Sequence, residues 1–229
     1  MENIIKTKNL KIGYDGLIIV PKFNCEIKKH CITSIIGPNG CGKSTVLKAI
    51  GRIIPHEAGT IIINDVEMKK LKTLQIAKMM AILPQSPTAP SSITVFDLVS
   101  YGRYPYQKGL GKLSKEDKEI INWALEATHM EEYKNRAICN LSGGQRQRVW
   151  IAMALAQQTD IILLDEPTTY LDLNHQLEIL ELLKELNQKN KTTIVMVLHD
   201  LNLASKYSDY LLAMKDGEIV KYGTPKEVF

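Results

Sequence analysis

The feature that most constrains this chain is residues 37–45, which read G-P-N-G-C-G-K-S-T and contain the pattern G-x-x-x-x-G-K-[ST]. The apolar run at 32–36 predicts a buried strand before it, and the residues from 43 onward predict a helix that ends near Ile54, before Pro55. A loop between the carboxyl end of a strand and the amino end of a helix turns its N–H groups toward one point, where the helix dipole adds positive charge. The sequence therefore predicts a strand–loop–helix unit that holds a polyphosphate.

The residue types in this loop suit separate tasks. Gly37, Gly40 and Gly42 let the backbone approach phosphates without a Cβ in the way. Lys43 is placed to reach the β- and γ-phosphates, and the Ser44 hydroxyl is a ligand for Mg²⁺. A glycine turn that only starts a helix is the alternative interpretation. The strand and helix expected on either side favour a nucleotide site.

Composition and cysteine spacing exclude several other classes of protein. The net charge of +4 is modest and mixed along the chain, which gives no footprint for sequence-independent nucleic-acid binding. The cysteines at 25, 31, 41 and 139 have neither C-x-x-C nor zinc spacing, so we expect reduced thiols in a cytosolic protein. The first residues lack the apolar core of a signal peptide, and no apolar run is long enough to span a membrane. We therefore expect any membrane association to come through a partner.

Polar residues follow three further predicted strands. Gln85, the pair Asp165 and Glu166, and His199 each come directly after an apolar run or one residue later. Open α/β sheets bind ligands at the carboxyl ends of their strands, so we expect these side chains to meet the phosphate loop in one crevice. A carboxylate pair in a surface turn, a surface glutamine and a structural histidine are the alternatives.

The expected chemistry of this crevice is hydrolysis of a phosphoanhydride. Asp165 would hold Mg²⁺ directly or through water, and Glu166 would orient or deprotonate the attacking water. The amide of Gln85 would reach the metal and the water. An imidazole at His199 would contact the γ-phosphate and sense its loss.

The chain is expected to form one domain, 1–229, with an insertion. Short β-rich runs with turn signals at 13–16 and Pro21 predict an antiparallel sheet near the start. Prolines and serines cluster at 84–92, and helical patterns without strand signals follow. We therefore expect an α/β core and β subdomain, with a helical insert over 88–157. The core and its subdomain comprise 1–87 and 158–229.

The insert contains helix-start signals and one unusual motif. Thr94-x-x-Asp97 and Ser114-x-x-Asp117 both predict helix starts. Residues 141–145 read L-S-G-G-Q, in which serine and glutamine form a capping box. The same geometry offers N–H groups to an anion. Two adjacent glycines in a first helical turn cost stability, which favours the anion-binding interpretation.

This ordered set of motifs resembles the ATP-binding cassette (ABC) family along essentially the whole chain. The L-S-G-G-Q motif upstream of I-I-L-L-D-E-P-T is the most specific part, since other phosphate-loop proteins lack it. The resemblance implies a P-loop NTPase (RecA-like) α/β core with an antiparallel β subdomain and an inserted α-helical subdomain. It also implies a head-to-tail homodimer. Each of its two ATP molecules would lie between the phosphate loop of one subunit and the L-S-G-G-Q motif of the other.

The resemblance also assigns roles to single residues. Tyr14 would stack on the adenine ring, Gln85 would sense the metal and the γ-phosphate, Glu166 would be the catalytic base and His199 the switch residue. Lys43 completes the catalytic set, and Mg²⁺ would be held by Ser44, Gln85 and Asp165. The expected ATP contacts within one subunit are Tyr14, Gly37, Pro38, Asn39, Gly40, Cys41, Gly42, Lys43, Ser44, Thr45, Gln85, Asp165, Glu166 and His199. The contacts expected from the second subunit are Ser142, Gly143, Gly144, Gln145 and Asp172.

Smaller stretches narrow the resemblance to one branch of the family. T-V-F-D-L-V-S-Y-G-R-Y-P-Y at 94–106 and L-H-D-L-N-L-A at 198–204 are similar to importer ATPases that serve iron–siderophore, haem and cobalamin uptake. The ferric-siderophore type, for ferric citrate or ferrichrome, is the nearest likeness. The sequence ends at Phe229, where such proteins usually continue, so we expect a C-terminal piece to be missing.

That branch implies partners and a location. The chain would be a peripheral subunit on the cytoplasmic side of the cell membrane. It would bind integral-membrane permease subunits and, indirectly, a periplasmic or lipid-anchored substrate-binding protein. The region 88–110, beside Gln85, would pass the motion of the ATPase to the permease. No nucleic-acid partner is expected.

Other functions stay open at this point. Importers of haem, cobalamin or a metal ion would share these motifs. A soluble ABC protein that acts on DNA or ribosomes usually carries a coiled-coil insert or a second cassette, and the sequence has neither. A GTPase needs N-K-x-D, and N-K-T-T at 190–193 lacks the aspartate. Only the stretch at 94–106 argues against an exporter subunit.

Overall fold

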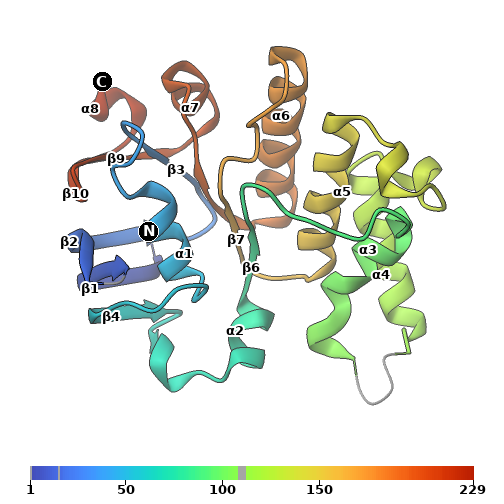
Figure 1. Ribbon diagram of the computed structural model, residues 1–229, viewed down its shortest axis with the longest axis horizontal. Helices are drawn as coiled ribbons and strands as arrows, with labels where there is room; N and C mark the ends of the chain where they lie inside the picture. Colours follow the sequence, from blue (N-terminus) through green and yellow to red (C-terminus); the bar gives the residue numbers. More distant parts are fainter. Residues whose placement is uncertain (1, 15, 108–111) are drawn as a thin grey trace.

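The computed structural model describes residues 2–14, 16–107 and 112–229, which form two β-sheets flanked by helices (Figure 1). One sheet is antiparallel, with the strand order β2-β1-β4-β5. Its strands are β1 (Asn3–Tyr14), β2 (Leu17–Lys28), β4 (Ala58–Ile63) and β5 (Val66–Glu67). The antiparallel sheet expected near the start of the chain is confirmed.

The turn expected at Pro21 is wrong, because Pro21 lies inside β2. β2 is an edge strand of its sheet. Its register with β1 shifts between the pairs Leu10–Phe23 and Ile12–Val20. A proline at a bulge of an edge strand removes no ladder hydrogen bond, so the strand continues through it.

The second sheet has the order β10-β9-β3-β8-β7-β6 and is parallel except for its last hairpin strand, β10. Its strands are β3 (Ile32–Ile36), β6 (Met80–Leu83), β7 (Ile161–Leu164), β8 (Thr193–Val197), β9 (Tyr210–Lys215) and β10 (Glu218–Gly223). Every residue of β3, β7 and β8 is buried. Strands covered on both faces read as continuous apolar runs, and the central strands expected from such runs are confirmed.

Helices cover both faces of the parallel sheet. They are α1 (Lys43–Ile50), α2 (Thr73–Met79), α6 (Leu173–Asn190), α7 (Leu201–Tyr207) and α8 (Pro225–Val228). The expected end of the first helix near Ile54 is wrong, because α1 ends at Ile50. Gly51 is its C-cap, and Arg52 takes a left-handed φ of 57°, which ends the helical path.

The described residues between β6 and β7 form helices and an isolated bridge but no strand of either sheet. The helices are α3 (Val95–Ser100), η2 (Tyr101–Tyr106), α4 (Lys115–Ala127), η3 (Glu131–Tyr133), η4 (Ile138–Asn140) and α5 (Gly143–Ala156). Thr94 and Ser114 are the N-caps of α3 and α4, as the sequence predicted. In Figure 1 these helices lie together at the end of the molecule opposite the antiparallel sheet.

The two faces of the parallel sheet bury two separate hydrophobic clusters. Successive residues of a strand point to opposite faces. Ile162 and Leu164 of β7 therefore pack with the helices α3–α7, whereas Ile161 and Leu163 pack with α1 and the antiparallel sheet. Among the described residues, no helix combines the length and the apolar character that a membrane crossing requires.

Candidate active site

The phosphate loop joins β3 to α1, and its glycines have backbone angles that other residues rarely adopt. The φ angles of Gly37, Gly40 and Gly42 are 146°, 77° and 96°. A Cβ at Gly37 would lie 2.1 Å from the carbonyl oxygen of Met214, so no side chain fits there. Gly42 is the left-handed N-cap of α1. The first N–H groups of a helix have no intrahelical partners, so the loop can offer them to an anion.

Lys43 is fixed beneath this loop. Its side chain is buried, and its Nζ donates hydrogen bonds to the carbonyl oxygens of Gly37 and Pro38 at 2.9 and 2.7 Å. Lys43 also lines the pocket described below. The loop thus holds an ammonium group at the place where phosphates would lie.

Ser44 and Asp165 bring two oxygen-bearing side chains together from α1 and the end of β7. The Ser44 Oγ donates a hydrogen bond to Oδ1 of Asp165 at 2.6 Å. Asp165 is almost fully buried, and its Oδ2 accepts no hydrogen bond. The Nζ of Lys48 lies 3.6 Å from that oxygen. A buried carboxylate with an unused oxygen is costly, and Mg²⁺ prefers oxygen ligands, so the pair fits a magnesium site.

Glu166 is held by three donors from three separate segments. Its Oε2 accepts from Gln85 Nε2 at 2.5 Å and from Thr169 Oγ1 at 2.9 Å. Its Oε1 lies 2.6 Å from Nε2 of His199. Glu166 also has a left-handed φ of 54°, a conformation that costs a non-glycine residue about 1–2 kcal/mol. A strained backbone that directs a carboxylate into a pocket is typical of a functional position.

The environment keeps the Glu166 carboxyl ionised. Burial raises its pKa, but the hydrogen bonds from His199 and Thr169 and the nearby imidazole lower it by more. The net result is a pKa below the ordinary value of 4.5. At neutral pH the side chain is therefore a carboxylate, which is the form that accepts a proton.

One pocket of about 490 Å³ brings together Lys43, Ser44, Gln85, Glu166 and His199. Its walls come from the antiparallel sheet, the phosphate loop and the carboxyl ends of the strands β6, β7 and β8. The lining residues are Tyr14, Ile19, Asn39, Gly40, Gly42, Lys43, Ser44, Thr45, Gln85, Glu166 and His199. Ten of these eleven are among the residues expected to contact ATP within one subunit.

Four residues of that expected set do not line the pocket. Gly37 and Pro38 offer their carbonyl groups to Lys43, and Asp165 lies beneath Ser44. Cys41 is buried, and its Sγ would contact a Cβ at Gly37 at 3.0 Å. These residues support the pocket rather than form its surface.

The L-S-G-G-Q residues and Asp172 also lie outside the pocket. Ser142 caps α5, and its own backbone N–H donates a hydrogen bond to Oε1 of Gln145 at 3.0 Å. Asp172 caps α6 and accepts from His175 Nδ1 at 2.8 Å. A Cβ at Gly144 would lie 2.5 Å from the His175 ring. The α5 and α6 starts are therefore packed together, away from the phosphate loop of the same chain.

Sequence reasoning missed three residues that the structure places at the site. Ile19 lines the pocket beside Tyr14, Thr169 donates to Glu166, and Lys48 pairs with Asp165. The spacing of Thr169, one turn after Glu166, was an available signal. No such signal was available for Ile19, because an apolar residue in a predicted strand is normally interpreted as part of the hydrophobic core.

Fold and site together define a P-loop ATPase, and the family model for "ABC transporter" matches residues 20–169. The chain therefore belongs to the ABC transporter family and is one of its ATP-hydrolysing cassettes. The family resemblance and the fold class expected from the sequence are confirmed.

Individual relatives are similar over nearly the whole chain. The iron(3+)-hydroxamate import ATP-binding protein FhuC of Bacillus subtilis is 58% identical over 226 residues, which are 99% of this chain and 84% of that protein. The structure of cbiO1 from Clostridium perfringens, part of the ABC transporter complex cbiONQ, has a TM-score of 0.89 and 31% identity, over 100% of this chain and 91% of that one. The cassette MJ0796, a dimer in a post-hydrolysis state with ADP and Pi, has a TM-score of 0.84 and 30% identity, over 97% and 99% of the two chains.

Proposed function

We propose that this chain is the ATP-hydrolysing subunit of an importer that takes up an iron chelate across the cytoplasmic membrane. The main support for ATP hydrolysis is that Lys43, Ser44 and Glu166 line the same pocket. The similarity to an iron(3+)-hydroxamate import protein supports the cargo class.

The binding steps follow from the loop. The free N–H groups at the start of α1 and the Lys43 ammonium would hold the β- and γ-phosphates. Tyr14 is half exposed at the pocket rim, where its ring can stack on adenine. Ile19 beside it would give the base an apolar contact.

We propose Mg²⁺ as the cofactor, held by Ser44, Asp165 and Gln85. The orphan Oδ2 of Asp165 and the adjacent Ser44 hydroxyl support this assignment. No group of three or more His, Cys, Asp or Glu side chains in the described ranges is arranged to hold a metal. Phosphate and water oxygens would therefore complete the ligand set. When bound, Mg²⁺ neutralises the charge that develops on the transferred phosphoryl group.

Glu166 would orient the attacking water and accept its proton, and His199 would contact the γ-phosphate. In the structure the two side chains contact each other through Nε2 of His199 and Oε1 of Glu166. A bound γ-phosphate and water would compete for those atoms, so nucleotide binding and the arrangement of the base are linked. Gln85 takes part in the same exchange through its bond to Glu166.

We propose that the chain works as a head-to-tail homodimer. Ser142–Gln145 and Asp172 lie away from the phosphate loop of their own subunit, as residues that serve a second subunit would. The dimeric post-hydrolysis structure of the MJ0796 cassette supports this arrangement. ATP would close the dimer, and hydrolysis with product release would reopen it.

The motion would pass to integral-membrane permease subunits through the region 88–110, of which 108–110 lie outside the described residues. Within it, Tyr101 and Tyr104 of η2 expose their rings to solvent. The chain would be peripheral on the cytoplasmic side of the membrane. A periplasmic or lipid-anchored binding protein would be an indirect partner, and no nucleic acid would be bound.

The test is affinity purification of the tagged chain from detergent-solubilised native membranes, with mass spectrometry of the eluate. We expect a polytopic permease to copurify. Uptake of ⁵⁵Fe-labelled ferric hydroxamate by a strain that lacks the gene should return with the wild-type chain and not with Glu166→Gln. Recovery of ribosomal or DNA-repair proteins without a permease would contradict the importer role, and unchanged uptake in the deleted strain would contradict the cargo class.

A further inference from the structure

The segment between β5 and α2 lies at the lower end of the molecule in Figure 1. We call four basic residues from this segment and from just after α1 the basic cluster: Arg52, Lys69, Lys70 and Lys72. Three of them come from the sequence K-K-L-K at 69–72, which follows β5. Arg52 follows α1 and donates from Nη1 to the carbonyl oxygen of Leu71 at 3.0 Å, which brings the guanidinium beside the lysines. All four are exposed.

The positive charge of the basic cluster is only partly neutralised. Lys70 pairs with Glu67 at 3.9 Å. For the other three, the described residues provide no carboxylate within ion-pair distance. The two other acids on the adjoining strands and turns are already engaged. Asp65 pairs with Lys6 at 2.7 Å and Glu57 pairs with Lys11 at 3.4 Å.

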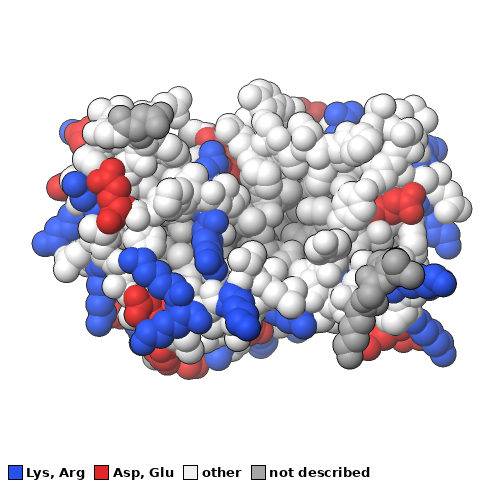
Figure 2. Space-filling view, turned by 60° about the horizontal axis from the view of Figure 1, so that its bottom comes forward, with Lys and Arg blue, Asp and Glu red and all other residues white. Residues whose placement is uncertain are grey.

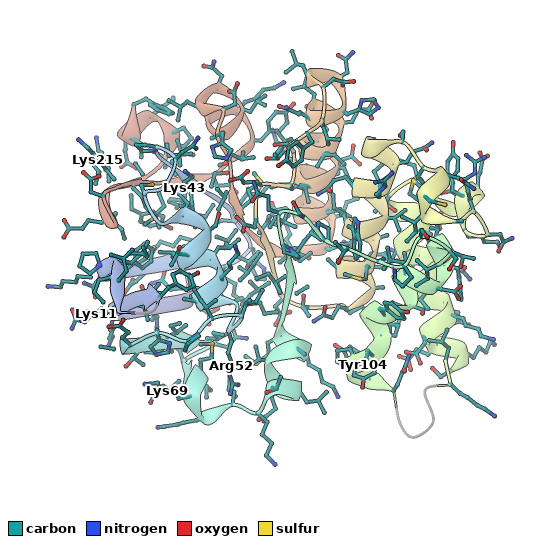
Figure 3. All side chains as sticks on the ribbon, in the orientation of Figure 1. Lys11, Lys43, Arg52, Lys69, Tyr104 and Lys215 are labelled. Atoms are coloured by element: carbon teal, nitrogen blue, oxygen red, sulfur yellow. The ribbon has the colours of Figure 1, made fainter. Side chains whose placement is uncertain are left out.

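Figure 2 shows lysines and arginines gathered on this face beside a hollow, and Figure 3 labels Arg52 and Lys69 at the same end as Tyr104.

Exposed apolar side chains stand among these charges. Ile53, next to Arg52, is 51% exposed, and Leu74, two residues after Lys72, is 55% exposed. Isolated exposed apolar side chains are common on protein surfaces, so what distinguishes these two is their position next to Arg52 and near Lys72 in the sequence. Lysine stems can lie along an apolar surface while their ammonium groups reach anions, so the two kinds of side chain can serve one interface.

The basic cluster is continuous with the surface assigned above to the permease. Lys78 of α2 lies 4.9 Å from the ring centroid of Tyr106 in η2, so α2 packs directly on η2. Tyr104 of η2 is 76% exposed. Tyrosines, aliphatic side chains and lysines on one face match the chemistry of the boundary between lipid headgroups and acyl chains.

We propose that the basic cluster binds anionic phospholipid headgroups of the membrane beside the permease, with Ile53 and Leu74 reaching the headgroup boundary. This inference rests on the proposed function, because the permease contact at η2 brings the cluster to the membrane surface. It gives the cassette a second membrane contact, one that the permease does not supply. Binding would be weak and dependent on salt, because exposed charges are screened over about 10 Å at 0.1 M salt.

The test is co-sedimentation of the purified full chain with vesicles of phosphatidylcholine alone or with about one third phosphatidylglycerol. We expect binding only to the anionic vesicles, with a strong decrease as salt is raised. Each lysine near such a surface contributes about a fivefold factor, so the triple variant Lys69→Gln, Lys70→Gln, Lys72→Gln should bind about a hundredfold more weakly at low salt.

The matched control removes three lysines from β9, β10 and α8 at the upper end of Figure 1: Lys215→Gln, Lys221→Gln and Lys226→Gln. It has the same net charge as the test variant and should bind vesicles like the wild type. ATP turnover and melting temperature should be the same in both variants and the wild type. Equal loss of vesicle binding in the two triple variants would show a net-charge effect and overturn the assignment.

Two further outcomes would also overturn it. One is that the wild-type chain does not bind anionic vesicles. The other is that the chain binds a short duplex DNA more tightly than it binds anionic vesicles at the same salt concentration. The proposed function is tested separately, by copurification of a permease. If a permease copurifies with the chain while vesicle binding is absent, only the headgroup site is wrong.

Discussion

The Nε2 atom of His199 lies 2.6 Å from Oε1 of Glu166, in the pocket that the phosphate loop also lines. The two residues follow the neighbouring parallel strands β8 and β7, which explains why residues 33 positions apart in sequence meet. Gln85, after β6, occupies the second carboxylate oxygen. The proposed base is therefore joined to both residues proposed to sense the γ-phosphate.

Replacing Glu166 with glutamine should separate nucleotide binding from turnover. Glutamine keeps the size of the side chain and can still bond to its neighbours, but it cannot accept a proton from water. General base catalysis contributes about 10²–10⁴-fold, so ATP turnover should fall by at least about 100-fold. ATP affinity should change by less than about threefold, since Lys43 and the loop N–H groups are untouched.

The closed dimer should accumulate in the same Glu166→Gln variant, because ATP would stay intact at the interface. Size-exclusion chromatography with ATP and Mg²⁺ measures this directly. Glu227→Gln, at the exposed start of α8, is the matched control and should behave like the wild type. Turnover of Glu166→Gln within tenfold of the wild type would remove Glu166 from the role of base.

Acid should destabilise the fold partly through Glu166. The folded-state pKa of this carboxyl lies below its ordinary value of 4.5, because hydrogen bonds from His199 and Thr169 outweigh burial. A depressed pKa contributes stability above pH 4.5 that is lost as the pH falls through the lower folded-state pKa. The melting temperature of the wild type should therefore fall across that window, and Glu166→Gln should make the fall shallower. If the melting temperatures of the two proteins fall equally with decreasing pH, the lowered pKa of Glu166 is contradicted.

Much of the site could be predicted because its polar residues interrupt or follow apolar runs. Lys43 and Ser44 stand in a glycine-rich loop after a strand, and Gln85, Glu166 and His199 follow strands in the same sheet. Parallel strands put their carboxyl ends at one edge, so sequence order alone brings these side chains together. Local patterns predicted two further features: apolar runs predicted the central strands, and capping patterns predicted the helix starts at Thr94 and Ser114.

The remaining features depend on tertiary packing that local patterns do not encode. Lys48 lies one turn after Ser44 on a helix, where a lysine usually faces solvent. It pairs with Asp165 only because β7 ends beside α1. Pro21 reads as a turn in isolation and is tolerated in β2 because the strand lies at a sheet edge. The basic cluster depends on Arg52 reaching a carbonyl group 19 residues away.

An alanine at Gly37 should destabilise the protein strongly. Gly37 has a φ of 146°, and the added Cβ would lie 2.1 Å from the carbonyl oxygen of Met214, a backbone atom that cannot rotate away. Backbone strain and overpacking together should lower the free energy of unfolding by about 2–5 kcal/mol. Urea denaturation followed by circular dichroism measures this change.

Gly16→Ala is the control for this experiment. Gly16 also has a positive φ, 84°, but nothing lies within 4 Å of an added Cβ. Only backbone strain applies there, so the loss should be about 1 kcal/mol. If Gly37→Ala costs no more than Gly16→Ala, the close packing of the phosphate loop on β9 is not tight in solution.

Lys48→Met should destabilise the protein by about 1–2 kcal/mol, because it removes the cation 3.6 Å from the buried Oδ2 of Asp165. The loss is expected to be smaller than the 3–5 kcal/mol typical of a fully buried pair. Lys48 is 35% exposed, and Ser44 still donates to the other oxygen of Asp165. The measurement is the free energy of unfolding from urea titration, and Lys48→Arg should recover most of the loss.

Lys189→Met is the matched control for Lys48→Met. Lys189 also sits on a helix and pairs with an acid, Glu185 at 3.3 Å, but both side chains are exposed. Exposed pairs spaced i,i+4 contribute only about 0.3–0.5 kcal/mol, so this variant should be nearly as stable as the wild type. Equal losses for Lys48→Met and Lys189→Met would mean that Asp165 does not depend on Lys48. The unsatisfied oxygen would then need another source of positive charge in the folded protein.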